Sequence, residues 1–464
     1  MIKKSLLHLI FTLQMFFVYG QVYFPDDSQV VNQRIEEWRN LKFGLFMHWG
    51  TYSQWGIIES WSLHPPDAYL RTGPYANNYF EYKKAYEDLQ KSFNPTGFEP
   101  EKWAIAAKNA GMKYVVFTTK HHDGFCMFDT KETTYKITDP SCPFSNSEKA
   151  DVTKAIFESF RRHGFWAGAY FSLADWNSDY FWWRKFPMCH ANVNYNINEY
   201  PERWQKFTEY THNQIIELMK NYKGLDILWL DGNWARDDGD LKLDTLVKKI
   251  REIKNDVIVV DRGSKTKREN YLTAENFVPN ETILYPWEVC LCSGGGWSHT
   301  PNAVYKTGRE GVHLLIDVVS KGGNLLLNIA PGPDGKWQQG AYGLLEAYGD
   351  WMKINSEGIY NTRAFAPYRE EKICITRKNT GFVYFFYLAD EGEDHMPAEI
   401  LIKSHQPASG ANVSLLGYNG KLKWQKEGEG FKVFIPEKVR ENPPCAYAWT
   451  IKVSEITPMH VQKN

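Results

Sequence analysis

Short apolar runs alternate with stretches of helical periodicity from Phe43 to about Pro331. This alternation is typical of parallel β-α-β units. A helix is predicted over 201–222, because its apolar residues recur with a period of about 3.6. Seven or eight such units in about 300 residues favour a (β/α)8-like barrel over an open sheet. The predicted strands are FGLFMHW (43–49), YVVFTTKHH (114–122), FWAGAYFSL (165–173), DILWLDG (226–232), VIVVDR (257–262), YPWEVCL (285–291) and NLLLNIAP (324–331).

The pattern changes after a helix predicted over 343–360. The segments ICITRK, FVYFFYLAD, AEILIKS, ANVSLLGY, FKVFIP and YAWTIKV are short, alternate apolar with polar residues, and are separated by Gly, Pro, Asn and charged turns. This pattern indicates an antiparallel β-sandwich. We therefore predict a barrel domain over residues 21–361 and a C-terminal sandwich over 362–464.

The first twenty residues carry Lys3 and Lys4, an apolar run over 6–18, and Gly20. This is the pattern of a secretory signal peptide, and the run is too short for a membrane-spanning helix. We predict that residues 1–20 are a signal peptide. The mature chain would then be exported to a periplasmic, extracellular or lysosome-like compartment, without a membrane span.

Composition narrows the class of partner. The formal net charge is -1, which argues against nucleic acid, because phosphate binding needs a clustered positive surplus. Aromatic residues make up 16% of the chain, against a usual ~8–9%; most should fill the core, and the rest could stack on sugar rings. The seven cysteines form no zinc-like pairs. A domain of this size does not need disulfides to fold, so we expect few or none. We also expect no metal and no cofactor. The sequence does not indicate an oligomeric state.

Polar or aromatic residues follow nearly every predicted strand. In a parallel barrel the carboxyl ends of the strands converge on one mouth, where barrel enzymes place their chemistry. The side chains expected at this mouth are His48, Trp49, His121, His122, Asp123, Ser172, Asp231, Arg262, Glu288 and Asn328.

Asp231 ends a strand that is expected to be buried on both faces, between Trp229 and Trp234. An Asp-Gly pair often only caps a turn. A carboxylate held at a barrel mouth beside aromatic rings, however, suits a nucleophile that attacks a sugar carbon.

A glycosidase of this kind needs a second carboxyl group as acid and base. Glu288 is the candidate, because it is expected to end a strand beside Trp287, and apolar neighbours raise a carboxyl pKa. The alternative is a rim glutamate paired to an arginine. Glu59 and Glu275 are rival acids, since both are expected in loops or at strand ends on the mouth side.

The run KHHDGF (120–125) holds two adjacent histidines, which in a strand would point to opposite faces and so share a metal poorly. Hydrogen bonding of His121, His122 and His48 to sugar hydroxyls is the favoured interpretation. Arg262 would neutralise an aspartate or grip the substrate. The glycines of SGGGW (293–297) are expected to form a loop that carries Trp297 to the site, with a plain turn as the alternative.

Taken together, these segments resemble the α-L-fucosidases of glycoside hydrolase family 29. The matching pieces run in family order from about residue 41 to 363: FGLFMHWGTYS, WAIAAKNAGMKYVVFTTKHHDGFCMFDT, GAYFS, LWLDG, VVDR, the dipeptide WE, LLIDVVSKGGNLLLNIAPGPDG and GDWMKINSEGIYNTR. The resemblance implies an exo-acting retaining enzyme that hydrolyses terminal α-L-fucosyl residues through a covalent fucosyl-enzyme.

The resemblance also implies roles for single residues. Asp231 matches the nucleophile and Glu288 is the best match to the acid/base. The implied substrate contacts are His48, Glu59, Trp61, His121, His122, Tyr170, Trp229 and Arg262. The chain departs from the family where DRW reads DRG, where GxYYS reads GAYFS, and where Glu-Trp-Tyr reads ESW.

Two alternatives remain at this stage. One is a sugar-binding protein that has lost turnover on the same scaffold. The other is a retaining glycosidase for a related sugar such as α-L-galactose, which differs from fucose by one hydroxyl at carbon 6. In the segment 176–196, Trp182, Trp183 and Arg184 could line further subsites or could simply pack the loop.

Overall fold

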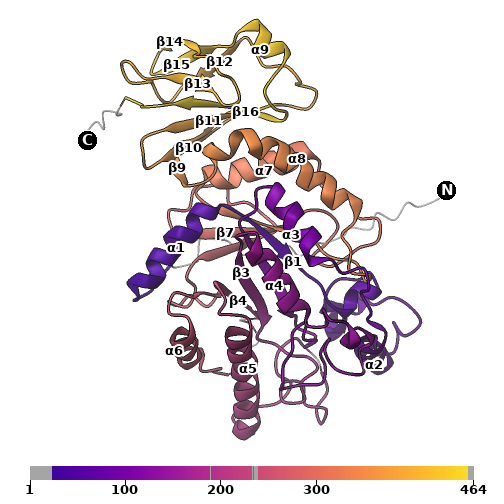
Figure 1. The fold of residues 1–464 in the computed structure, drawn as a ribbon. Helices are drawn as coiled ribbons and strands as arrows, with labels where there is room; N and C mark the ends of the chain where they lie inside the picture. The colour runs from indigo at the N-terminus through magenta and orange to yellow at the C-terminus, as the bar shows by residue number, and fades with distance from the viewer. Residues whose placement is uncertain (1–22, 189, 233, 235–238, 458–464) are drawn as a thin grey trace, which may run out of the picture.

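The computed structural model describes residues 23–188, 190–232, 234 and 239–457 (Figure 1). The predicted signal peptide, residues 1–20, lies outside the described residues.

Eight parallel strands form one sheet in the order β5-β4-β3-β2-β1-β8-β7-β6, which leaves β5 and β6 as its two edges. The sheet therefore curls into a nearly closed barrel, and the fold prediction is confirmed. The two edge strands are the shortest, with four residues each, and the inner strands are mostly buried. The strands are β1 Phe43–Met47, β2 Tyr114–Lys120, β3 Trp166–Ser172, β4 Ile227–Asp231, β5 Ile258–Asp261, β6 Leu272–Glu275, β7 Trp287–Cys292 and β8 Asn324–Asn328.

Helices cover the outside of this sheet (Figure 1). The predicted helix over 201–222 is α5, which buries Trp204, Phe207, Ile215 and Leu218, as its periodicity requires. In the described part of the chain, no α-helix follows β5 or β6, unlike an ideal barrel. The helices are α1 Gln29–Leu41, α2 Tyr79–Glu87, α3 Pro100–Asn109, α4 Val152–Arg162, α5 Pro201–Asn221, α6 Leu243–Ile253, α7 Gly308–Ser320 and α8 Gln339–Asn355.

The C-terminal part contains a five-stranded and a three-stranded antiparallel sheet, which confirms the predicted sandwich. Their inner faces share one apolar core, to which Ile375 and Phe385 of one sheet and Ile402 and Val433 of the other contribute. Strands β9 and β14 and the short α9 were not predicted. The elements are β9 Thr362–Glu370, β10 Ile373–Lys378, β11 Val383–Leu388, β12 Glu399–Ile402, β13 Val413–Leu415, β14 Lys423–Glu427, β15 Gly430–Phe434, α9 Glu437–Glu441 and β16 Ala448–Val453.

The sandwich rests on α7 and α8 of the barrel (Figure 1). Trp351 of α8 donates a 2.9 Å hydrogen bond from Nε1 to the carbonyl of Ala448. Thr450 donates from its hydroxyl to Asn355 over 2.7 Å. Since all four residues are buried, these bonds fix the two parts to each other.

The six described cysteines are free thiols, and Cys189 lies outside the described residues. Within the described ranges, no helix has the length and apolar character needed to cross a membrane.

Candidate active site

Asp231 is the last residue of β4, and its partner in the sheet is Ser172, the last residue of β3. Its carboxylate accepts a 2.8 Å hydrogen bond from the Tyr170 hydroxyl, and its other oxygen lies 3.3 Å from a guanidinium nitrogen of Arg262. Burial alone would raise the pKa of Asp231, but the positive charge of Arg262 and the bond from Tyr170 outweigh it, so the pKa lies below its ordinary value. Asp231 is therefore ionised, as a nucleophile must be.

Arg262 follows β5 and joins Asp231 to a second carboxylate. One guanidinium nitrogen binds Asp231, and the other binds Glu275 in a short ion pair. Glu275 is the last residue of β6, so it stands at the same end of the barrel as Asp231. Its side chain is 32% exposed, whereas that of Asp231 is 16% exposed. The structure thus brings together two carboxylates, one deeper and one nearer the rim.

Glu59 lies close to this pair but is only 3% exposed. Burial raises the pKa of its carboxyl to about 8, and the neighbouring charge of Glu275 adds to the rise. Among the described residues, no side chain or backbone group hydrogen-bonds its Oε2 atom. A carboxyl with this pKa is protonated at neutral pH, so Glu59 can donate a hydrogen bond.

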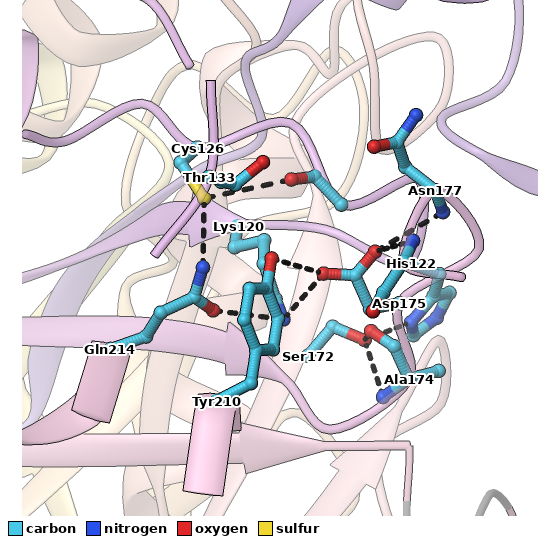
Figure 2. Close-up of polar contacts among 12 residues, drawn as sticks. Lys120, His122, Cys126, Thr133, Ser172, Ala174, Asp175, Asn177, Tyr210 and Gln214 are labelled. Carbon is cyan, nitrogen blue, oxygen red and sulfur yellow. Dashed lines mark hydrogen bonds and ion pairs between the residues drawn. The ribbon is translucent and has the colours of Figure 1, made fainter. Parts of the chain in front are cut away.

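His122 and His48 are held by one ring nitrogen each. Ser172 donates its hydroxyl proton to the carbonyl of Ala174 (2.8 Å) and so must accept from His122 Nδ1, 2.7 Å away (Figure 2). His48 Nδ1 lies 2.9 Å from the amide oxygen of Asn328. In both rings Nδ1 therefore carries the proton, and Nε2 is left as an acceptor. His122 Nε2 lies 3.9 Å from Asp231.

His121 completes the group, with Nδ1 2.6 Å from the Ser60 hydroxyl. Burial lowers the pKa of all three histidines, to about 4 for His48 and His122, so they are neutral near pH 7. The expectation that adjacent histidines point to opposite faces was wrong, because β2 ends at Lys120 and both rings follow it in a turn, with centroids 4.2 Å apart. Even so, no set of side chains suited to a metal ion occurs in the described chain.

Aromatic rings form the floor and walls of this site. Trp229 stacks on Tyr170 with centroids 5.5 Å apart. The loop 293–297 does carry Trp297 to the mouth, where its ring lies 5.1 Å from that of His48. Trp61 lies on the other side, with its ring edge-on to His122 at 5.3 Å. These apolar surfaces surround the polar groups that face Asp231.

Glu288 is not at the mouth, and the prediction that it ends its strand was wrong. It is the second residue of β7 and pairs with Asn324, the first residue of β8, so it lies toward the opposite end of the barrel. It is fully buried. Three donors bind its carboxylate: Tyr114 at 2.6 Å, and Trp229 and Tyr271 at 3.2 Å each. Burial nevertheless raises its pKa to about 7.

The position of Glu288 has a steric cause. Gly44 of β1 makes room for the Tyr114 ring, since a Cβ there would lie 2.4 Å from it. Tyr114 can then reach across the barrel interior to Glu288. The Trp229 indole lies between this buried carboxylate and the mouth, bonded to Glu288 through Nε1 and stacked on Tyr170. Glu288 thus supports the floor of the site from below.

Comparison with known proteins decides the family. The sequence model described as Alpha-L-fucosidase matches residues 17–357, and the one described as Alpha-L-fucosidase C-terminal domain matches 368–454. The chain belongs to the α-L-fucosidase family. The resemblance found in its motifs is thereby confirmed, and the chain is a glycoside hydrolase of the α-L-fucosidase type.

The similarity between this fucosidase and its relatives extends over nearly the whole chain. The tissue α-L-fucosidase of Mus musculus is 26% identical over 93% of this chain and 94% of its own. The α-L-fucosidase isoenzyme 1 of Paenibacillus thiaminolyticus superposes with a TM-score of 0.74 at 27% identity, covering 92% of this chain and 100% of that one. The α-fucosidase of Thermotoga maritima, solved with a mechanism-based inhibitor, gives 0.74 at 26% identity, covering 94% and 100%.

Ser172 and Asn328 were expected at the mouth, but not as supports of histidine rings, and Ser60 was not predicted at all. Ser60, Ser172 and Asn328 each hold a histidine ring. Ser172 and Asn328 had a signal, because both end strands at the mouth, whereas Ser60 lies in a loop with no pattern to reveal it. Trp176 was also missed; its ring lies 5.4 Å from that of His122.

The loop after β3 mainly packs on itself. Trp182 is 2% exposed and stacks on Trp176 with centroids 5.0 Å apart. Trp183 packs among Phe186 and Tyr200 and lies under Arg203. Of the two interpretations of this segment, the contacts favour packing of the loop.

Proposed function

We propose that this chain is an exo-acting retaining α-L-fucosidase that removes terminal α-L-fucosyl residues from oligosaccharides or glycoconjugates. The observation that supports it is the pair Asp231 and Glu275, joined by Arg262 at the mouth of the barrel. Retaining glycosidases need two carboxyl groups about 5–5.5 Å apart, one as nucleophile and one as acid and then base. Two carboxylates on one guanidinium fit that arrangement.

In the first step Asp231 attacks the anomeric carbon, and the bond to the leaving oxygen breaks as Glu275 protonates it. We assign this acid role to Glu275 in place of Glu288, because the leaving group departs toward solvent and Glu288 is enclosed beneath Trp229. The leaving oxygen has to take the place that the Arg262 guanidinium holds beside Glu275. In the second step Glu275 takes a proton from water, which attacks the fucosyl-enzyme and releases Asp231.

The remaining groups recognise the sugar. The Nε2 atoms of His48 and His122 are acceptors for sugar hydroxyls, and protonated Glu59 is a donor. Rings such as Trp61, Trp229 and Trp297 provide apolar surface for the methyl group of fucose. In support, the Thermotoga maritima relative has also been solved with fucose, at 25% identity and a TM-score of 0.71, covering 90% of this chain and 96% of that one.

The test of this function is the stereochemistry of hydrolysis. We expect release of 4-nitrophenol from its α-L-fucoside, with α-L-fucose as the first anomer seen by proton NMR before mutarotation. The β-anomer as first product would contradict retention. No release from any fucoside would favour a sugar-binding protein, and equal rates on the α-L-galactoside would indicate the broader sugar specificity.

Ionisation of Glu59 should cause the fall in kcat/KM at alkaline pH. Its pKa of about 8 means that it ionises as the pH rises through that value. The new negative charge would lie beside Glu275 and remove a donor from the sugar, so kcat/KM should fall above about pH 8. In Glu59→Gln no proton can be lost, and this fall should move to higher pH. Measuring kcat/KM from about pH 6 to about pH 10 checks this.

The control for Glu59→Gln is Glu346→Gln, which changes an exposed glutamate of α8 and should leave the profile as it is. An alkaline limb that stays in place in Glu59→Gln would show that another group sets it.

We also propose that residues 21–361 are the catalytic domain, that residues 362–464 are the C-terminal domain, and that the enzyme is exported. Export is supported by residues 1–20, in which two lysines precede an apolar run. It is also supported by two relatives from Homo sapiens, which are named tissue and plasma α-L-fucosidase. Recovery of an unprocessed chain from the cytoplasm alone would contradict export.

A further inference from the structure

A buried ion pair lies directly behind the histidines. Lys120 is the last residue of β2, and its side chain is 0% exposed. Its ammonium group lies 3.2 Å from the carboxylate of Asp175, whose side chain is 1% exposed (Figure 2). The ammonium also donates to the amide oxygen of Gln214 over 3.3 Å and lies 4.2 Å from the centroid of the Phe171 ring. Neither charge belongs to the proposed mechanism.

The Asp175 carboxylate is saturated with donors. One oxygen accepts from Lys120 and from the Tyr210 hydroxyl at 3.0 Å. The other accepts from the backbone N–H groups of Asn177 at 3.1 Å and Ser178 at 2.8 Å. Asp175 therefore fixes the turn that follows β3 and ties it to α5, which carries Tyr210.

Three links join Lys120 and His122, at and just after the end of β2, to the end of β3 and the residues that follow it. The first is the pair Lys120–Asp175. The second is the bond from the Trp176 N–H to the carbonyl of His122, 2.8 Å long. The third is the bond between His122 Nδ1 and Ser172. His122 is therefore linked through its carbonyl to Trp176, which follows Asp175 directly, and through its ring to the end of β3.

The local packing leaves little freedom for this arrangement. Gly124 has a φ of +84°, and a Cβ at this position would lie 2.2 Å from an Asp175 oxygen. Asp123, also buried, is a second carboxyl nearby and accepts from Tyr86 over 2.8 Å. The Lys120 ammonium is paired with Asp175, and its charge also acts on Asp123.

Such a pair contributes little net stability, because removing two charges from water costs about as much as their attraction returns. The pair does fix the relative position of the two segments that carry it, because the two charged groups must stay in contact. We propose that Lys120 and Asp175 are positioning residues that hold His122, with its Nε2 toward Asp231, and Trp176 beside it. This inference rests on the proposed function, because the group they place is a sugar-binding histidine.

The test compares Lys120→Met, Asp175→Asn and the double variant. Each single variant leaves a buried charge unpaired and should lower the melting temperature. The double variant has no unpaired charge from this pair, and the amide introduced at position 175 keeps an oxygen for the N–H groups of the turn, so its melting temperature should recover. Its kcat/KM on 4-nitrophenyl α-L-fucoside should nevertheless stay about 10- to 100-fold below that of the parent, because a misplacement of about 1 Å costs this much.

Binding separates positioning from mere stability. The dissociation constant of L-fucose and the KM should both rise in the double variant, measured at a temperature where circular dichroism shows every variant folded. A matched control is Asp26→Asn with Arg251→Met, which removes a partly buried ion pair that joins α6 to the residue stretch before α1. This control should keep the parental KM.

The outcomes are distinct. A folded double variant with parental KM and L-fucose affinity would overturn the positioning role and leave the proposed function intact. A parent that neither hydrolyses fucosides nor binds L-fucose would overturn the proposed function, and the positioning role with it. Weak binding in a folded double variant with an unaffected control supports the proposal.

Discussion

Replacing Asp231 with alanine is expected to lower kcat on an aryl α-L-fucoside by about 10⁴-fold or more, the scale seen when a covalent nucleophile is removed. The carboxylate is ionised and is aimed by Tyr170 and Arg262, so it is the group that would attack the anomeric carbon. The loss should fall on kcat for good and poor leaving groups alike, because formation of the fucosyl-enzyme itself is blocked. Steady-state kinetics with 4-nitrophenyl α-L-fucoside measures it.

Azide makes this test specific. In Asp231→Ala, azide can enter the space left by the carboxylate and attack directly, which gives β-L-fucosyl azide with inverted configuration. Asp350→Ala is the control, because Asp350 is an exposed residue of α8. Near-parental activity in Asp231→Ala, or an azide product of α configuration, would show that Asp231 is not the nucleophile.

Replacing Glu275 with alanine should have an effect that depends on the leaving group. General acid catalysis contributes about 10²–10⁴-fold, and most of it is needed only when the departing oxygen is basic. We therefore expect a loss of this size on fucosylated oligosaccharides and a smaller loss on an activated aryl fucoside. Azide should restore the second step in this variant and yield α-L-fucosyl azide, because Asp231 still forms the intermediate.

Glu288→Gln and Glu59→Gln are the matched comparisons for Glu275. Glu288 is bonded to Trp229 in the barrel interior, so its replacement should impair activity on all substrates equally and give no fucosyl azide. If azide restored the activity of Glu288→Gln or Glu59→Gln but not that of Glu275→Ala, the residue replaced in the rescued variant would be the acid/base.

Much of the fold could be predicted because buried parallel strands are long apolar runs. The exception is β6, whose sequence LTAE has four residues and only one large apolar side chain. Without that strand, the pattern left Glu275 as one of several acids in loops or at strand ends. The strands β9 and β14 escaped for a related reason, since many of their residues are exposed or half-buried and polar.

The site shows where a sequence pattern stops being informative. Asp231 was found because an apolar strand ended on it. Glu288 was misplaced because an apolar pattern shows that a residue belongs to a strand but not at which residue the strand begins. Its pairing with Asn324 places Glu288 near the start of β7. The side chains that turn the histidine rings come from different strands and loops, so only the folded chain reveals them.

The open edge of the barrel, between β5 and β6, separates the strands that carry Asp231 and Glu275. The backbone ladder runs from β5 through β1 to β6, and in the described chain β5 and β6 stand at its two ends. Asp231 lies on β4, next to the edge strand β5, and Glu275 lies on the edge strand β6. Arg262 forms ion pairs with both across the gap between the two edges. The proposed nucleophile and the proposed acid are therefore connected across this gap by a side-chain ion pair and not by backbone hydrogen bonds between β5 and β6. Under the proposed function, substitutions in the loops at this edge are expected to change the preference for leaving groups and to leave the residues around Asp231 in place.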